Sequence, residues 1–197
     1  MTTTTADAIR AAALRLLEDE GPAAVSLRRV ATAVGITAMA IYHHFPSREA
    51  LLHDVCDAEF NRHAALLVAN QQKSGGSIEA RLARNLDAFL DFALQRPHVY
   101  DLVFSQPREG ARRYPEDFKA RRSPTFNVLA DLVAEAMHTG LFRKGDVWEV
   151  TLMIGAHTQG LITLWRGGRF SLSEKEFRAL CLRSARRLID GLKQPKR

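Results

Sequence analysis

The sequence predicts an all-α protein of about nine helices. Nearly every segment repeats its apolar residues at the spacing of an amphipathic helix, and no stretch sustains the alternation typical of a strand. The boundaries between segments are residues that start or stop helices, with Ser, Thr or Asp before a segment and Gly or Pro after it. The composition, 46% hydrophobic and 25% charged, is that of a folded globular protein and excludes a disordered or collagen-like chain.

The first four predicted helices are bounded by start and stop signals. Gly21-Pro22 ends the first helix, because proline cannot continue it and glycine tolerates a left-handed cap. Ser26 and Thr37 are residues that cap helix N-termini, and Gly35 separates the two short helices that they begin. The long fourth helix has an apolar side formed by Leu51, Leu52, Val55, Ala58, Phe60 and Leu66. These helices are expected at Ala6–Glu20, Ser26–Val34, Thr37–His44 and Arg48–Lys73.

The remaining helices follow a break at Ser74-Gly75-Gly76. Residues 106–124 are the most polar and proline-containing stretch, and we expect them to form a partly ordered loop. The last helix begins with a capping box at Ser173 and Glu176. The helices of this part are expected at 77–95, 97–105, 125–139, 146–166 and 173–191.

Residues 26–45 fit a helix-turn-helix, in which two short helices cross over a tight turn. The crossing needs a small residue on the first helix, which Ala31 supplies. It also needs a turn residue that tolerates a positive φ, which Gly35 supplies. The apolar residues that could pin the two helices together are Leu27, Val30, Val34, Ile36 and Ile41. An ordinary helical hairpin in a bundle is the alternative interpretation of this stretch.

The residues around this motif closely resemble the TetR family of transcriptional regulators. The resemblance covers roughly the first 55 residues and rests on the glycine turn, on Ile41-Tyr42-His43-His44-Phe45 and on Arg48-Glu49-Ala50-Leu51. A second and weaker resemblance is to a Trp/His/Gly-bearing C-terminal domain found in part of that family. Its residues are Trp148 and Gly155-Ala156-His157-Thr158-Gln159-Gly160.

The resemblance implies a homodimer that binds a palindromic DNA operator, usually as a repressor, and that is released when a small-molecule effector enters the C-terminal domain. It implies a DNA-binding domain at 1–47 and a ligand-binding and dimerisation domain at 48–197, connected by the helix at 48–73. The positions that it places at DNA are Ser26, Arg28, Thr37, Tyr42, His44 and Arg48. We add His43, which lies between two of them on the second helix.

The start of the second helix departs from a base-reading pattern, because Ala38-Met39-Ala40 carries no Asn, Gln or Arg. We therefore expect Ala38, Met39 and Ala40 to contact thymine methyl groups, with part of the specificity resting on DNA shape. Arg28 is the candidate for a guanine edge. The chain carries a net charge of +6, but residues 1–48 hold five basic and four acidic side chains. Phosphate binding must therefore rest on a few placed groups.

Aromatic residues are concentrated in the larger C-terminal part. Small-molecule sites are mostly apolar with a few polar groups, so this part has the composition for an effector site. By analogy with the family, we expect the site to be lined by Phe89, Phe92, Phe126, Met153 and His157. Aromatic residues at helical spacing are more often part of a core than of a pocket, and His157 could equally be satisfied within the structure. The expected effector is an apolar or aromatic small molecule.

The helices near 146–166 and 173–191 carry apolar stripes that can pack on a symmetry mate as well as on their own domain. A dimer is favoured because two recognition helices must lie about 34–36 Å apart to read a palindrome.

Two other function classes stay open. The first is a constitutive DNA-binding dimer without an effector. The second, a helical enzyme, is disfavoured because the sequence has no GxSxG, P-loop, HExxH or paired Cys/His motif, and no metal or cofactor is expected. Cys56 and Cys181 are interpreted as buried thiols. No apolar run reaches the ~18 residues of a membrane span, and the N-terminus lacks the pattern of a secretion signal, so we expect a cytoplasmic protein.

Overall fold

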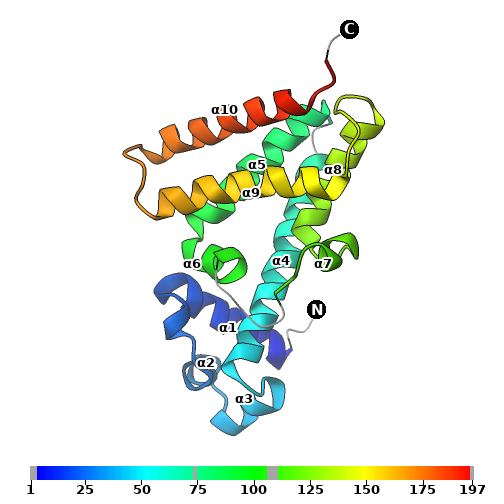
Figure 1. Ribbon diagram of the computed structural model, residues 1–197. Helices are drawn as coiled ribbons and strands as arrows, with labels where there is room; N and C mark the ends of the chain where they lie inside the picture. Colours follow the sequence, from blue (N-terminus) through cyan, green and yellow to red (C-terminus); the bar gives the residue numbers. More distant parts are fainter. Residues whose placement is uncertain (1–3, 73–74, 106–110, 196–197) are drawn as a thin grey trace. The chain divides into compact units, whose positions relative to one another are not determined.

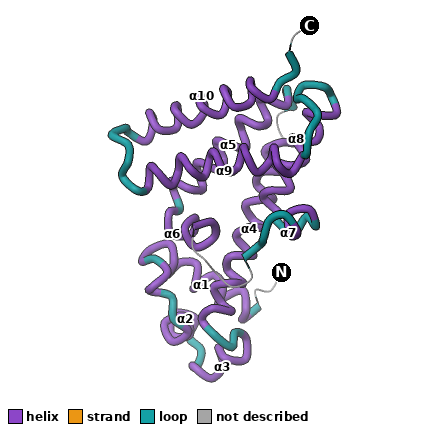
Figure 2. Tube along the Cα trace, viewed as in Figure 1, coloured by secondary structure: helices purple, strands orange, loops and turns teal. Residues whose placement is uncertain are grey.

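The computed structural model describes residues 4–72, 75–105 and 111–195, and helices make up its regular structure (Figures 1 and 2). The described part of the chain contains ten α-helices and no β-strand, which confirms the all-α prediction. The helix beyond the nine expected is α7 (Glu116–Lys119), four residues long, inside the predicted loop. None of the helices in these ranges combines the length and the apolar character that a membrane span requires.

Residue contacts divide the chain into two compact units. The first comprises the described residues of 1–62 and 92–111, and the second comprises those of 63–91 and 112–197. Helices α4 (Arg48–Gln72) and α5 (Ile78–Gln95) therefore contribute to both units. The first unit also holds α1 (Thr5–Glu20), α2 (Leu27–Val34), α3 (Ala38–His44) and α6 (Pro97–Tyr100). The second also holds α7, α8 (Pro124–His138), α9 (Val147–Arg166) and α10 (Glu174–Leu192).

Capping side chains fix where the first helices begin. Thr4 Oγ1 accepts a hydrogen bond from the Asp7 N–H while the Asp7 carboxylate accepts one from the Thr4 N–H, so α1 begins one residue earlier than expected. Ser26 and Thr37 cap α2 and α3 as the sequence predicts, each accepting a backbone N–H three residues on. The core of these helices comprises Ile9, Ala12, Ala13, Leu17, Val25, Leu27, Val30, Ala31, Ile41 and Phe45.

The buried side of α4 differs from the predicted one. Leu66 was expected on the apolar side, but it is 47% exposed. The buried side continues instead through Glu59, His63 and Leu67, which follow Val55 at helical spacing. Glu59 and His63 thus occupy buried positions at which the helical repeat predicts apolar residues. The prediction was wrong here because it selected residues by hydrophobicity alone.

The segments around the predicted loop are partly outside the described residues. The helix expected at 97–105 begins at Pro97 as α6 and continues as a π-helical turn over Asp101–Ser105. Of the loop expected at 106–124, residues 106–110 lie outside the described part. So do Lys73 and Ser74 at the predicted end of the fourth helix, and the last two residues of the basic tail.

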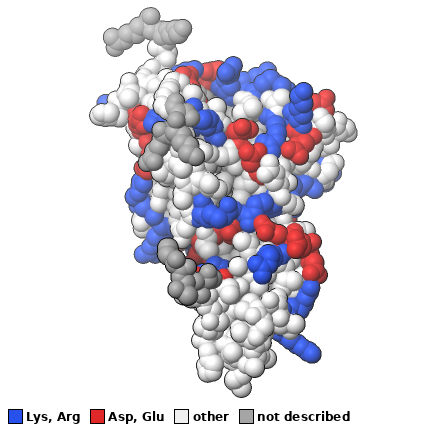
Figure 3. Space-filling view, turned by 180° about the vertical axis from the view of Figure 1, so that it is seen from behind, with Lys and Arg blue, Asp and Glu red and all other residues white. Residues whose placement is uncertain are grey.

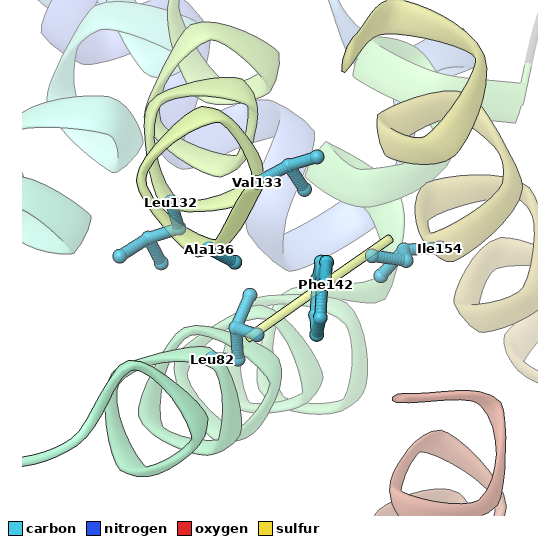
Figure 4. Close-up of a cluster of buried hydrophobic side chains, with 6 residues drawn as sticks. All are labelled: Leu82, Leu132, Val133, Ala136, Phe142 and Ile154. Carbon is cyan, nitrogen blue, oxygen red and sulfur yellow. The ribbon is translucent and has the colours of Figure 1, made fainter. Parts of the chain in front are cut away.

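The core of the second unit forms where α5, α8 and α9 surround Phe142, as Figure 4 shows. Phe142 follows α8 and is fully buried, which contributes about 1.5–3 kcal/mol relative to leaving the ring in water. The cluster consists of Leu82, Leu132, Val133, Ala136, Phe142 and Ile154. Trp165 of α9 stacks on Phe177 of α10 with ring centroids 4.5 Å apart. The capping box predicted at the start of α10 is present.

The two cysteines are buried thiols, as predicted. Cys56 belongs to the first unit and Cys181 to the second. Burial raises the pKa of Cys181 to about 11, so this thiol is protonated at neutral pH.

Candidate nucleic-acid interface

The turn between α2 and α3 is built on Gly35. Its φ of +77° is a left-handed conformation that glycine adopts without the clash of a β-carbon. The N–H groups of Gly35 and Ile36 both donate to the carbonyl of Ala31, which closes the end of α2. Thr37 then caps α3. The helix-turn-helix predicted from the sequence is therefore present at the predicted residues.

Helix α3 buries one side and exposes the other. Ile41 is fully buried in the core formed by α1, α2 and α3. We call these three helices the head. Met39 and Tyr42 are 71% and 55% exposed. The remaining residues predicted at DNA on this helix are also accessible, with Ala38, His43 and His44 exposed and Ala40 half-buried. The helix thus presents apolar, phenolic and imidazole groups on its outer side.

The two arginines at the start of α2 differ in their partners. Arg29 binds Glu20 through two hydrogen bonds of 2.6 and 3.0 Å, which lower the pKa of Glu20 and raise that of Arg29. Arg28 is exposed and forms no ion pair with any residue in the described ranges. Its guanidinium is available to an external partner, whereas that of Arg29 is engaged within the head.

Arg48 has a structural role as well as a charge. Its Nε donates to the carbonyl of Val25 at 2.7 Å, and its Nη2 donates to that of Pro22 at 2.6 Å. These bonds hold the start of α4 against the turn that precedes α2. Two of the donors that the sequence assigned to DNA are therefore directed into the protein, while the guanidinium keeps its positive charge.

The hydroxyls of Ser26 and Thr37 accept backbone N–H groups at 3.3 and 3.1 Å, which leaves the O–H of each able to donate to a phosphate. Figure 3 shows that the end of the molecule formed by α2 and α3 carries few charged side chains on the face in view. This agrees with the near-neutral charge balance of residues 1–48.

The residues predicted to line an effector site lie in different surroundings, beginning with the two on α5. Phe89 is half-buried in the second unit, with its ring centroid 5.9 Å from that of His63. Phe92 is buried in the first unit against Tyr100 and Phe104, at ring centroid distances of 6.4 and 6.1 Å. The two phenylalanines are therefore assigned to different units.

The three predicted effector residues on α8 and α9 also lie in different environments. The ring of Phe126 lies under Gly155, where a β-carbon would come within 3.1 Å of it, so this glycine allows α8 and α9 to approach closely. Met153 lies on the outer side of α9 and is 41% exposed. His157 Nε2 lies 2.9 Å from Ser184 Oγ of α10, which gives this histidine a partner within the protein.

Periodicity missed three buried polar side chains, Glu59 and His63 on α4 and Asn85 on α5. Glu59 accepts hydrogen bonds from Arg96 and Arg62, and burial raises its pKa. Burial lowers the pKa of His63 to about 4. The signal available in the sequence was their spacing, because Glu59 and His63 follow Val55 at four-residue intervals and so share its buried side.

Family models match both parts of the chain. Residues 9–55 match the model of the bacterial regulatory proteins of the tetR family. Residues 82–192 match the model of the tetracyclin repressor-like C-terminal domain, which covers more than half of the chain.

Individual relatives agree with these matches. The nucleoid occlusion factor SlmA of Marinobacter nauticus is 27% identical over 143 residues, which span 71% of this chain and 69% of that protein. A protein of unknown function from Rhodococcus sp. RHA1 has a similar structure, with a TM-score of 0.79 at 25% identity over 98% of this chain and 97% of that one. The transcriptional regulator FadR from Bacillus subtilis, solved with stearoyl-CoA, has a TM-score of 0.73 at 16% identity over 93% and 97% of the two chains, a likeness of fold alone.

Proposed function

Because the chain belongs to the TetR family of bacterial regulatory proteins, we propose that it binds a palindromic operator as a homodimer, represses transcription there and is released by a small-molecule effector. The chain is a DNA-binding transcriptional regulator with a ligand-binding domain, and not an enzyme. The finer statements about operator, dimer, repression and effector are the proposal. The observations that support it most directly are the exposed outer side of α3 and the exposed, unpaired cation of Arg28 on α2.

In this proposal the outer side of α3 enters the major groove. Arg28 reads a guanine through its O6 and N7 acceptors, while Met39, with Ala38 and Ala40, contacts thymine methyl groups. Ser26, Thr37 and Tyr42 bind phosphates together with the two exposed histidines and Arg48. Specificity at positions that the protein does not touch then depends on DNA shape. The proposed place of action is the cytoplasm, and the proposed division between DNA-binding and ligand-binding domains lies at residue 47.

The test of this proposal is the selection of bound duplexes from a random DNA pool by the full-length protein at physiological salt. Recovery of a two-fold symmetric site supports the proposal. Recovery of unordered sequences, bound with a steep dependence on salt, would contradict it, because non-specific binding rests on phosphate contacts alone.

The selected operator then distinguishes the two arginines of α2. We expect Arg28→Ala to weaken operator binding by about tenfold to a hundredfold, because it removes a bidentate base contact. Arg29→Ala is the matched control, since it lies one residue on and its guanidinium is engaged by Glu20. Fluorescence anisotropy with labelled operator measures both. Equal losses for the two variants would show that α2 contributes charge and not base recognition.

The outer side of α9 supports the homodimer. Met153 and Leu164 are large apolar residues exposed on this helix, and Leu182 is exposed on α10. Ala156 and Gly160 lie between Met153 and Leu164 at helical spacing and are also exposed, so a second copy could approach the backbone closely there. An isologous contact across this face would form a four-helix interface from α9 and α10 of both copies.

A charge on this face is expected to prevent dimerisation. Leu164→Glu buries a carboxylate at the proposed interface, so we expect sedimentation velocity at micromolar concentration to detect monomers. Leu66→Glu is the control, because Leu66 on α4 is exposed to nearly the same extent, 47% against 48%. A Leu164→Glu protein that sediments as the wild-type dimer would place the interface elsewhere.

The effector part of the proposal competes with a constitutive dimer that has no ligand. The support for an effector comes from the C-terminal family model and from the polar side chains buried in the second unit, since binding sites combine apolar walls with a few polar groups. Release of the selected operator by an added small molecule would decide between the two.

A further inference from the structure

Asn85 of α5 is a buried amide whose polar atoms are unsatisfied. The residue is 6% exposed, and neither Oδ1 nor Nδ2 has a hydrogen-bond partner among the described residues. Leaving both ends of a buried amide unpaired costs a protein free energy, so native structures contain few such groups. Asn85 is not among the residues predicted at a site, and it takes no part in the contacts of the head.

Most of the residues that lie one turn from Asn85 on α5 are apolar, and the exception is Arg81. Leu82 precedes it by three residues and Phe89 follows it by four, so the three share one side of α5. Leu82 belongs to the cluster around Phe142. Ala88, one turn further along, packs against a second cluster formed by Ala64, Leu67 and Val128 of α4 and α8. Asn85 thus lies on α5 between residues that belong to two hydrophobic clusters of the second unit.

No buried side chain in the described part of the second unit is charged at neutral pH. The buried polar residues there are His63, Asn85, Ser123, Thr125, Thr151 and Thr158. The imidazole of His63, whose pKa burial lowers to about 4, is neutral and lies 5.9 Å from the ring of Phe89. The two arginines that precede Asn85 on α5 are engaged within the protein, Arg81 with the carboxylate of Glu135 and Arg84 with the Gly75 carbonyl. A carboxylate or phosphate brought beside Asn85 would therefore lose its hydration without gaining a free cation, which is unfavourable.

We propose that Asn85 is the polar anchor of the effector site, binding an uncharged hydrogen-bonding group, such as an amide, lactone or alcohol, carried on an apolar body. A carboxamide offers two donors and an acceptor oxygen, so it can satisfy such a group in either sense. Phe89 supplies an apolar wall on the same side of α5. This inference rests on the proposed function, because it names the chemistry of the effector that the regulator would bind.

The first test needs no ligand. Asn85→Leu keeps the number and branching of the side-chain heavy atoms and removes the unsatisfied amide, so we expect full-length protein to melt about 2–6 °C higher than the wild type. Asn127→Leu is the matched control on α8, where Nδ2 donates to the Arg121 carbonyl at 2.7 Å, and we expect it to melt lower. A lower Tm for Asn85→Leu would show that the amide is satisfied within the protein and would overturn the proposal.

The second test uses matched pairs of probes in thermal-shift measurements, namely decanamide and decanoate, benzamide and benzoate, and naphthamide and naphthoate. We expect at least one amide to raise the Tm of the wild type, its carboxylate partner to leave it unchanged, and Asn85→Leu to respond to neither. Equal shifts for the two members of a pair, equal responses from wild type and variant, or no shift with any amide would overturn the proposal.

The two proposals fail separately. If the wild type selects a symmetric operator but no amide raises its Tm, only the proposed role of Asn85 as the polar anchor is overturned. Amide binding that depends on Asn85, in a protein that selects no DNA sequence, would overturn the regulatory role and leave the binding site in place.

Discussion

Replacing Arg96 with methionine is expected to lower the free energy of unfolding by about 3 kcal/mol at neutral pH, because it leaves a buried carboxylate without its main cation. Arg96 Nη1 donates to Oε2 of the buried Glu59 at 2.5 Å, and its Nε donates to Oε1 of Glu18 at the same distance. Its guanidinium also lies 5.7 Å from the centroid of the Phe92 ring. One side chain thus joins α1, α4 and the end of α5 within the first unit.

The pH dependence of this loss identifies its cause. Burial raises the pKa of Glu59, and the Arg96 charge opposes that rise. Without Arg96 the pKa of Glu59 in the folded state rises further above its unfolded value of 4.5. A carboxyl whose pKa is raised by folding contributes stability that is present below the unfolded value and is lost as the pH rises through the folded value. The loss caused by Arg96→Met should therefore be smaller at pH ~5 than at pH ~7.5.

Urea denaturation at the two pH values measures this difference. The control is the double variant Arg96→Met with Glu59→Gln, which removes the buried charge. We expect it to recover part of the lost stability and to show little of the pH dependence. A single variant equally destabilised at both pH values would mean that Arg96 acts through packing on Phe92 and not through its charge.

The head could be predicted from the sequence because its determinants are local. Ser26, Gly35 and Thr37 fix the ends of α2 and α3 through bonds to residues within a few positions. The network of Arg96 could not be predicted in this way, since its partners lie 37 and 78 residues away along the chain.

The surroundings of the predicted effector residues could not be predicted, because aromatic content does not specify which unit a ring belongs to. Phe89 and Phe92 are three residues apart on α5, yet they belong to different units, because the division between the units falls between them. Helical periodicity places both on one side of α5 but does not indicate where a tertiary cluster ends. The buried amide of Asn85 was overlooked for a related reason, since a polar residue at a buried position breaks the pattern by which buried positions are recognised.

Acidification is expected to destabilise the protein through His63, and His63→Leu is expected to remove that contribution. The buried imidazole has its pKa lowered from 6.5 to about 4. Between these values the unfolded chain binds a proton that the folded protein does not, so stability is lost as the pH falls through this window. The shift corresponds to about 3 kcal/mol between pH ~6.5 and pH ~4.

The measurement is the free energy of unfolding of wild type, His63→Leu and His53→Leu at a series of pH values from ~7 to ~4. His53 is the control because it lies on the same helix with its side chain exposed. The difference between wild type and His63→Leu should grow as the pH falls, since the variant has no imidazole to protonate on unfolding. The His53→Leu variant measures the effect of replacing an exposed histidine on the same helix. A difference between wild type and His63→Leu that stays constant over the whole range would mean that the folded protein accommodates the imidazolium. The interior around Phe89 would then tolerate a charge. Burial in this interior would no longer be a reason to exclude anionic effectors.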